Sequence, residues 1–376
     1  MTFQVSTKLS SCQTLTGFFE TWQVGQNDLL VSYESSFISP YLGGKAAPCD
    51  VLYQADYGLG EPTDEMIDKM LLAAGNKQYD RIIAIGGGTI IDIAKLMIFG
   101  DGLTCDEIFA QGATLPRKRK LIVIPTTCGA GSEVTMISIV RFEQLNTKKG
   151  LAVPALFPDE AVLIPSLLTS QLYETFAASS IDALIHSAES YISPKATPFS
   201  KAIARDSIER IVKGYKAIKA AGVQKVPGVE EMHSFLVAST MGGIAFGNAG
   251  VGAVHALSYP VGAIYHVPHG KANYMFFGAV FSAYKKLGAQ MPELERVLEG
   301  ALECHEADCK TGGVWNCLFE LIDFILPRQK LSALGADEAK CKEMAASVVK
   351  NQQRLLVNNP IPLTEEQIYE IYLECM

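Results

Sequence analysis

Length, composition and charge already narrow the class of protein. The chain has 376 residues, of which 48% are hydrophobic and 19% are charged, and its formal net charge is −8. Because a single hydrophobic core stops growing at about 250 to 300 residues, we expect a well-buried globular protein with two domains. The lysines and arginines form no basic run, which argues against a nucleic-acid partner.

The cysteines and the N-terminal segment favour a reducing compartment. Nine cysteines form no CxxC pair and are odd in number, so the sequence implies neither a disulfide framework nor a zinc ribbon. Residues 1–19 lack the basic and apolar regions of a signal peptide, and no stretch reaches about 18 uninterrupted apolar residues. We therefore expect a cytoplasmic protein with no membrane partner.

Short β-branched runs alternate with helical patterns in the first half of the chain. The expected strands are 27–33, 49–54, 81–85 and 120–125, and the expected helices between them are 64–75 and 89–100. Such alternation predicts a parallel sheet with crossover helices. The runs RIIAI and LIVI carry little polar alternation, as is typical of central strands that helices cover on both faces.

The second half of the chain is predicted to be helical. Strand signals vanish from about Pro165 onward, and residues 207–222, 337–349 and 364–376 follow the 3.6-residue spacing of helices. Thr364 and Gln367 form the signature of a capping box. We therefore expect an α/β domain over residues 1–165 and an all-helical domain over residues 166–376.

Two small-residue loops follow the predicted central strands. Gly86, Gly87 and Gly88 stand between strand 81–85 and the next helix, where backbone amides can receive a phosphate. The loop is neither a GxGxxG nor a Walker A sequence, so a bare strand-to-helix turn is the alternative. The second loop, residues 125–132, follows strand 120–125. Two such loops at the carboxyl ends of parallel strands indicate a shared ligand crevice.

Histidines are scarce and gather in two stretches of the sequence. Of six histidines, His186 lies four residues after Asp182, which on a helix places both side chains on one face. His255 and His269 lie fourteen residues apart, and Pro260 with the nearby glycines is expected to turn the chain back so that both imidazoles converge. One carboxylate and three imidazoles leave an open position on a divalent metal, the pattern of a catalytic site. The alternative is that these groups are hydrogen-bonded core residues.

His266 is a further candidate for function. It stands three residues before His269, and on a helix the two side chains would share a face. A proton relay and a surface histidine are both consistent with this position.

Several segments resemble the iron-containing (group III) alcohol dehydrogenase family. The resemblance rests on GGGTIID, PTTCGAGSEVT, IDALIHSAESY and the stretch from His255 to His269, and it extends from about residue 28 to the C-terminus. It implies a Rossmann-like dinucleotide-binding α/β domain followed by a helical domain, with the active site in the interdomain cleft. It also implies that Asp182, His186, His255 and His269 are the metal ligands. The positions that match the family's cofactor contacts are Gly86, Gly87, Gly88, Thr89, Asp92, Thr126 and Thr127.

The resemblance also implies an activity. Within the family, the sequence of residues 179–200 and 245–277 favours the interconversion of 4-hydroxybutyrate and succinic semialdehyde with NAD(H). Fe²⁺ is the expected metal, and Zn²⁺ is its main competitor. The substrate would carry a carboxylate, for which Arg141, Lys271 and Arg354 are candidate partners. A homodimer is a further expectation.

Two positions depart from the family's pattern. Many members have a histidine where this chain has Tyr259, so Tyr259 and His266 are both candidates for the proton route. Many NAD-using members carry an aspartate after the second strand, where this chain has Tyr33 and then Glu34. Glu34 is therefore the expected partner of the adenosine ribose, and both NAD and NADP stay open.

Three other functions stay open from the sequence. The first is another alcohol or polyol dehydrogenase of the same family, of the butanol, lactaldehyde or glycerol type. The second is an NAD- and metal-dependent lyase of the dehydroquinate synthase type, which would return its hydride internally. The third is a nucleotide-binding sensor with a structural metal.

Overall fold

The chain folds into two compact units. The structure is a computed structural model that describes residues 2–75, 77–100, 102–145, 147–303 and 313–376. The sheet unit comprises Val5–Ser170 and Gly228–His233, and the helical unit comprises Met1–Gln4, Gln171–Pro227 and Ser234–Met376. Because neither unit is one continuous segment, the predicted division after residue 165 stays a prediction.

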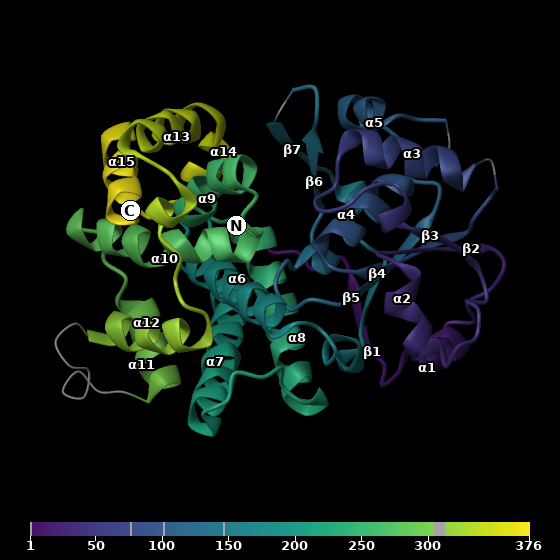
Figure 1. The fold of residues 1–376 in the computed structure, drawn as a ribbon, viewed down its shortest axis with the longest axis horizontal. Coiled ribbons are helices and arrows are strands. Elements are labelled where there is room, and N and C mark those ends of the chain that lie inside the picture. Colours follow the sequence, from purple (N-terminus) through teal and green to yellow (C-terminus); the bar gives the residue numbers. More distant parts are fainter. Residues whose placement is uncertain (1, 76, 101, 146, 304–312) are drawn as a thin grey trace. The chain divides into compact units, whose positions relative to one another are not determined.

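Six parallel strands form the sheet, in the order β1-β8-β5-β4-β2-β3 (Figure 1). In chain order they are β1 (Lys8–Ser11), β2 (Asp28–Ser32), β3 (Asp50–Tyr53), β4 (Arg81–Gly86), β5 (Lys120–Pro125) and β8 (Glu160–Leu163). The prediction of a parallel sheet with 81–85 and 121–124 at its centre is confirmed, since β4 and β5 are neighbours in the middle.

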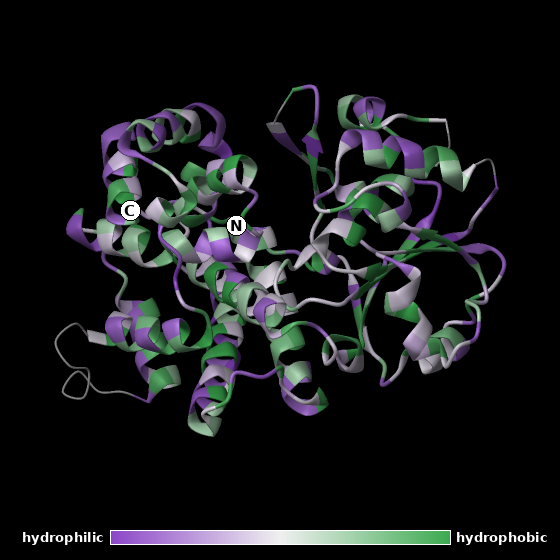
Figure 2. Ribbon diagram, viewed as in Figure 1, coloured by the Kyte–Doolittle hydropathy of each residue, from purple (hydrophilic) through white to green (hydrophobic). Residues whose placement is uncertain are grey.

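The two central strands are buried on both faces. Ile82 and Ala84 of β4 belong to a core that also contains residues of α3 and α4, while Ile83 and Ile85, which point to the opposite face, are fully buried as well. Figure 2 shows these strands as predominantly hydrophobic. Burial on both faces explains why their sequences lack the polar alternation of half-exposed strands.

The helices of the sheet unit connect the strands. They are α1 (Leu15–Thr21), α2 (Ser35–Ile38), α3 (Asp64–Ala74), α4 (Gly88–Met97) and α5 (Cys105–Gln111), with 3₁₀ helices at Ser39–Leu42, Gln54–Asp56, Ser132–Val134, Pro154–Leu156 and Pro165–Leu168. The predicted helices 64–75 and 89–100 are confirmed as α3 and α4. Thr63 caps α3, because its hydroxyl accepts a hydrogen bond from the Met66 N–H.

Four strands of this unit were not predicted. They are the edge strand β1, its neighbour β8, and the antiparallel pair β6 (Ile137–Phe142) and β7 (Thr147–Ala152). β1 and β8 are four residues long, and β7 reads TKKGLA with mostly exposed or half-buried residues. The short strands β1 and β8 and the polar strand β7 carry little of the hydrophobic periodicity that a strand prediction needs.

Every regular element that the structure describes from Gln171 onward is a helix, which confirms the prediction of a helical second half. The helices are α6 (Tyr173–Ile192), α7 (Pro198–Ala221), α8 (Val229–Ala249), α9 (Ala253–Tyr265), α10 (His269–Lys286), α11 (Pro292–Leu302), α12 (Gly313–Ile325), α13 (Glu338–Asn351), α14 (Gln353–Leu356) and α15 (Glu365–Glu374), with a 3₁₀ helix at Leu331–Leu334. The capping box of Thr364 and Gln367 is confirmed at the start of α15.

The chain reverses after α9 at a different place from the predicted one. Pro260 lies inside α9 and does not end it, although a proline lacks the N–H that would bond to the carbonyl four residues earlier. The reversal comes at His266, which has a left-handed conformation with φ 54°, and at Pro268, which precedes α10. His266 and His269 therefore belong to different segments, and the predicted helical relation between them is wrong.

The chain bends sharply before α9 as well. The axes of α8 and α9 differ by 106° across residues 250–252. Among the described residues no single helix has the length and hydropathy needed to cross a membrane, whereas this bent pair meets those two criteria.

Candidate metal centre

Three helices bring the predicted metal ligands together. Asp182 and His186 lie on α6, His255 lies on α9, and His269 is the first residue of α10. One possible ligand atom from each of the four side chains lies within 4.8 Å of those of the others. The Asp182 Oδ1 atom is 3.7 Å from His255 Nε2 and 4.0 Å from His269 Nε2. The cluster that the sequence predicts is thus compact enough for one cation.

Close helix packing holds the four candidate ligands at these distances. A Cβ atom built on Gly270 would lie 2.1 Å from the Ala178 carbonyl oxygen, so only a glycine lets the start of α10 approach α6 so closely. That approach places His269 beside Asp182. Glycine is needed at position 252 too, since a Cβ there would lie 2.6 Å from the Asn359 Oδ1 atom and 3.3 Å from the Glu189 Oε1 atom.

Burial decides the charge state of the cluster. The side chains of Asp182 and His255 are 6% and 2% exposed, whereas that of His269 is 40% exposed. Burial lowers the pKa of His186 to about 4 and that of His255 to about 3. Burial raises the pKa of Asp182, but the three imidazoles and the Asn273 amide more than offset it, and the net pKa is lowered. Neutral imidazoles beside an ionised carboxylate are the protonation states that a divalent metal requires.

A buried orphan atom tests whether this donor set fits a metal. The Nε2 atom of His255 is buried and has no hydrogen-bond partner among the described residues, and it faces Asp182 at 3.7 Å. An unpaired buried nitrogen is costly unless a ligand satisfies it. The other ring nitrogen of His255, Nδ1, is already bonded to Glu189, so Nε2 is the nitrogen that points into the cluster. A cation bound there would satisfy Nε2, and the residues present therefore fit a metal ion.

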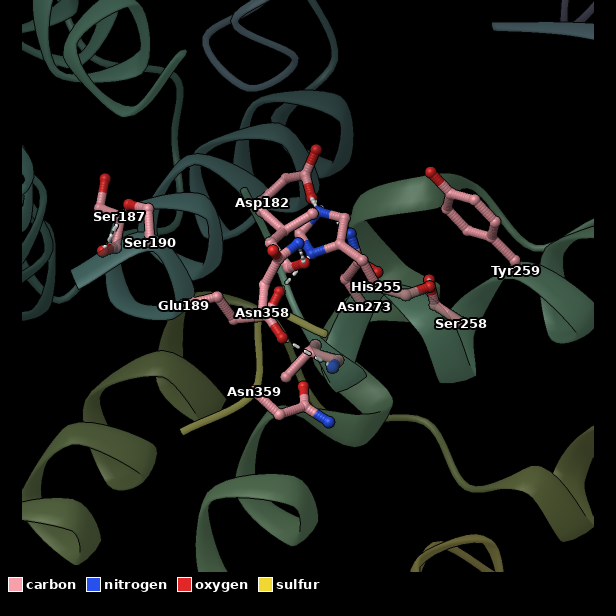
Figure 3. A network of polar contacts seen from close by, with 12 residues as sticks. Asp182, Ser187, Glu189, Ser190, His255, Ser258, Tyr259, Asn273, Asn358 and Asn359 are labelled. Atoms are coloured by element: carbon pink, nitrogen blue, oxygen red, sulfur yellow. Dashed lines mark hydrogen bonds and ion pairs between the residues drawn. The ribbon is translucent and has the colours of Figure 1, made fainter. Parts of the chain in front are cut away.

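Glu189 orients this imidazole and was not predicted from the sequence. Its Oε2 atom lies 2.6 Å from His255 Nδ1, and its Oε1 atom accepts a hydrogen bond from the Val254 N–H at 2.7 Å (Figure 3). A carboxylate on the far nitrogen of a ligand histidine fixes its tautomer and makes it a better donor. Glu189 lies three residues after His186 and seven after Asp182 on the same helix, and that spacing was the signal in the sequence.

Asn273 was also missed. Its Nδ2 atom donates to Asp182 Oδ1 at 2.6 Å and lies 3.2 Å from His269 Nε2. Figure 3 shows Asp182, His255 and Asn273 crowded together. Asn273 lies one helical turn after His269 on α10, but an asparagine at that spacing carries no metal signature of its own. It holds Asp182 toward the histidines.

The two proton-route candidates occupy different positions. Tyr259 lies on α9 with its ring centroid 6.0 Å from that of His269, and its hydroxyl accepts a hydrogen bond of 3.4 Å from Arg354 Nη2. His266 caps the C-terminal end of α9 and is exposed. Among the contacts of the described residues, none joins His266 to the cluster.

The two predicted cofactor loops are adjacent in the sheet unit. Gly86 ends β4, Gly87 precedes α4, and the Thr126 N–H donates to the Gly86 carbonyl at 3.1 Å. A Cβ atom on Gly87 would lie 3.3 Å from the Thr127 side chain. Gly88 and Thr89 open α4, where the N–H groups of a first helical turn have no partner within the helix. These groups could receive a phosphate.

Asp92 and Lys95 fasten the second loop to α4. Asp92 accepts hydrogen bonds from Ser132 Oγ at 2.6 Å and from the Ile139 N–H at 2.9 Å. The fully buried ammonium of Lys95 donates to Ser132 Oγ at 2.7 Å and to the Ile137 carbonyl at 2.6 Å. Burial lowers the pKa of Lys95 to about 8. Both oxygens of Asp92 therefore bond within the unit, and its predicted cofactor contact stays a prediction.

Glu34, which is predicted to bond to the adenosine ribose, follows β2 in the chain. It is the residue before α2, and its Oε1 atom accepts a hydrogen bond from Ser36 Oγ. Tyr33 beside it is 41% exposed. The carboxylate therefore stands just beyond the carboxyl end of a parallel strand, where a ribose is read in dinucleotide-binding folds.

Fold and site together define a class of protein. A parallel sheet with adjacent loops at the carboxyl ends of two neighbouring strands is typical of nucleotide-binding units. Three imidazoles with one carboxylate are typical of a catalytic rather than a structural metal site. The chain is therefore a metal-dependent enzyme of the nucleotide-binding α/β class.

Comparison with known proteins gives the family. Residues 25–165 match the iron-containing alcohol dehydrogenase model and residues 176–376 match the C-terminal model of the Fe-containing alcohol dehydrogenase family. The chain belongs to the iron-containing alcohol dehydrogenase family, and it is a metal-dependent alcohol dehydrogenase. The predicted family membership is confirmed.

Individual relatives agree with this family. The chain is 41% identical over 357 residues to 4-hydroxybutyrate dehydrogenase of Clostridium kluyveri, with 94% of each chain covered. It is 32% identical over 323 residues to long-chain-alcohol dehydrogenase 1 of Geobacillus thermodenitrificans, covering 83% of this chain and 79% of that one. The crystal structure of sulfoacetaldehyde reductase from Bifidobacterium kashiwanohense in complex with NAD⁺ has the same fold, with a TM-score of 0.84 at 20% identity over 100% of this chain and 98% of that one.

Lys95→Met is expected to destabilise the sheet unit. The substitution removes the hydrogen bonds to the loop and leaves Asp92 without its cation, and breaking a buried ion pair costs about 3–5 kcal/mol. Urea unfolding followed by circular dichroism measures the loss. The control is Lys8→Met, since the Lys8 side chain is 69% exposed and its pair with Glu160 contributes about 0–1 kcal/mol. Equal shifts in the two variants would contradict the role given to Lys95.

Glu189→Gln is expected to weaken metal binding about 10- to 100-fold, the usual effect of losing a partner of a ligand histidine. Competition with a chelator on the metal-free protein measures the Zn²⁺ dissociation constant. Glu293→Gln is the matched control, because Glu293 is exposed and pairs with Lys201. An unchanged affinity in a folded Glu189→Gln protein would show that Glu189 does not act on the ligand.

Proposed function

We propose that this dehydrogenase interconverts succinic semialdehyde and 4-hydroxybutyrate with NAD(H). The observation that carries the proposal is the identity of 41% over 94% of both chains with 4-hydroxybutyrate dehydrogenase of Clostridium kluyveri. In the reduction, the aldehyde carbon gains a hydride and the aldehyde oxygen gains a proton, while NADH becomes NAD⁺. No side chain has to act as a nucleophile.

The metal would be held by Asp182, His186, His255 and His269. Iron(II) is the ion that the family implies, and zinc is its main competitor because an imidazole and carboxylate set suits both. With the metal and NADH bound, the metal would serve as the Lewis acid at the aldehyde oxygen and NADH as the hydride donor. The part of this chain is to hold three imidazoles and one carboxylate in place, with Glu189 and Asn273 behind them.

The dinucleotide would bind the sheet unit. Gly86, Gly87, Gly88 and Thr89 offer a strand-to-helix turn for the pyrophosphate, and Thr126 and Thr127 lie against it. Glu34 supports NAD over NADP, because a carboxylate bonds to the ribose 2′-hydroxyl and repels a 2′-phosphate. Asp92 would act by holding the second loop.

The proton route would use this chain's own polar groups. Tyr259 is the stronger candidate, since its ring lies 6.0 Å from that of the ligand His269. A tyrosine hydroxyl can pass a proton between solvent and a substrate oxygen. His266, exposed at the end of α9, is the second candidate.

The proposal also includes three predictions, which concern the substrate's acid group, the oligomeric state and the cellular location. A carboxylate on the substrate follows from the likeness to a hydroxy-acid dehydrogenase. A homodimer is implied by the family resemblance, and a cytoplasmic location stays a prediction from the sequence.

A comparison of substrates tests the proposed reaction. Protein purified without oxygen is expected to contain one equivalent of iron or zinc and to oxidise NADH with succinic semialdehyde far faster than with butanal or lactaldehyde. Elemental analysis and NADH absorbance measure both quantities. Comparable rates with all three aldehydes would favour a general alcohol dehydrogenase, and product formed without NADH consumption would favour a lyase.

His269→Ala separates a catalytic metal from a structural one. His269 is 40% exposed at the start of α10, so its loss is expected to leave the circular dichroism spectrum unchanged while metal content falls and activity drops at least about 100-fold. His233→Ala is the control, because His233 is exposed and has no predicted role. If His269→Ala unfolds and His233→Ala does not, the metal is structural and the sensor reading is favoured.

A further inference from the structure

We propose that Arg354 binds the carboxylate of the substrate and thereby makes the enzyme selective for aldehydes that carry an acid group. The inference rests on the proposed function and adds a specificity-determining residue to it. Three observations support it, namely the position of Arg354, the absence of an acidic partner for Arg354 among the described residues, and the partners of the other two candidate cations.

Arg354 lies close to the exposed side of the metal centre. It belongs to α14, which packs against α9. The ring of Tyr259 on α9 connects it to the centre, since the Arg354 guanidinium carbon is 5.9 Å from the Tyr259 ring centroid and the His269 ring centroid is 6.0 Å from it. His269 is the candidate ligand with the most exposed side chain, and Arg354 is exposed as well, so solvent reaches both side chains.

The two contacts through the Tyr259 ring place the Arg354 guanidinium carbon at most about 12 Å from the His269 ring centroid, a span that a short substrate can cover together with the bonds at its two ends. The aldehyde oxygen and the carboxylate of an extended four-carbon semialdehyde lie roughly 6 Å apart by standard bond lengths. An arginine side chain is long and flexible, and its end can follow such a ligand. The carboxylate can therefore meet the guanidinium while the aldehyde stays at the metal ligands.

The guanidinium has bonding capacity left. Its Nη2 atom donates a hydrogen bond of 3.4 Å to the Tyr259 hydroxyl, and the guanidinium forms no ion pair with a carboxylate in the described parts of the chain. A guanidinium has five N–H donors in a planar fork that matches a carboxylate. The Tyr259 ring supports this cation without neutralising its charge.

The other two cations that the sequence offers are already paired. Lys271 on α10 binds the Glu174 carboxylate, with its ammonium donating to Oε1. Arg141 lies on β6 of the sheet unit and pairs with Glu143 at 3.3 Å. Recruiting either one would break an existing ion pair, whereas Arg354 would only exchange a long bond to Tyr259 for two bonds to a carboxylate.

Arg354→Leu tests the proposal with two substrates of similar length. The ratio of kcat/KM for succinic semialdehyde to kcat/KM for butanal is expected to fall about 10- to 100-fold, mostly through a higher KM for the semialdehyde, because a hydrogen-bonded charge pair is lost. Arg354→Lys keeps the positive charge but loses the planar pair of N–H donors, so its ratio of the two kcat/KM values is expected to lie between those of the parent protein and Arg354→Leu. Arg296→Leu is the control, since Arg296 is exposed on α11 and donates a hydrogen bond to the Pro292 carbonyl of its own helix.

The outcomes separate this proposal from the proposed function. If the parent protein prefers succinic semialdehyde and Arg354→Leu keeps that preference, the carboxylate binds elsewhere and the role of Arg354 is overturned. If Arg354→Leu loses kcat equally with both aldehydes, the residue supports the site without reading the acid group, which also overturns the proposal. If the parent protein shows no preference, both the proposed function and the role of Arg354 fail.

Discussion

The structure depends on placing one carboxylate among three imidazoles inside a bundle of helices. Removing Asp182 from water raises the free energy of its ionised form, and polar neighbours that include the Asn273 amide offset that penalty. The same burial keeps His186 and His255 neutral. A divalent cation resolves this imbalance, since it needs the states that burial and the neighbours already impose. The helices α6, α9 and α10 thus surround a carboxylate whose buried charge has to be stabilised.

That requirement explains several local features of the helical unit. The start of α9 lies against Glu189, so one carboxylate bonds both to a backbone N–H and to the His255 ring. Gly252 and Gly270 lie at two positions where a larger side chain would collide with a neighbouring group, Asn359 and the Ala178 carbonyl respectively. The sheet unit also contains buried charged groups with a structural role. Asp92 and Lys95 both form hydrogen bonds with Ser132, and these bonds hold the second loop beside the glycine turn.

Much of the fold and of the metal cluster could be predicted because the signals were local and strong. The apolar runs of β4 and β5 and the spacing of Asp182 and His186 need no tertiary information. The meeting of His255 and His269 with α6 rested on scarcity of histidine and on resemblance, and the place of the turn was wrong because Pro260 is tolerated within α9. The strands β1 and β8 were missed since they are short, and Asn273 was missed because a neutral amide shows its role only beside Asp182. Arg354 was one of three equal candidates until its distance from Tyr259 and the partners of the other two were known.

The unequal exposure of the ligands has a kinetic consequence. Asp182 and His255 are closed in by the helices, while the His269 side chain is 40% exposed. An ion held by this cluster would be most accessible at His269, and rotation of that one side chain is a much faster motion than separation of packed helices. The lifetime of the bound ion then depends on how tightly Asn273 and Tyr259 restrain a single imidazole. Two relatives with the same four ligands can thus differ in how fast they exchange iron for zinc.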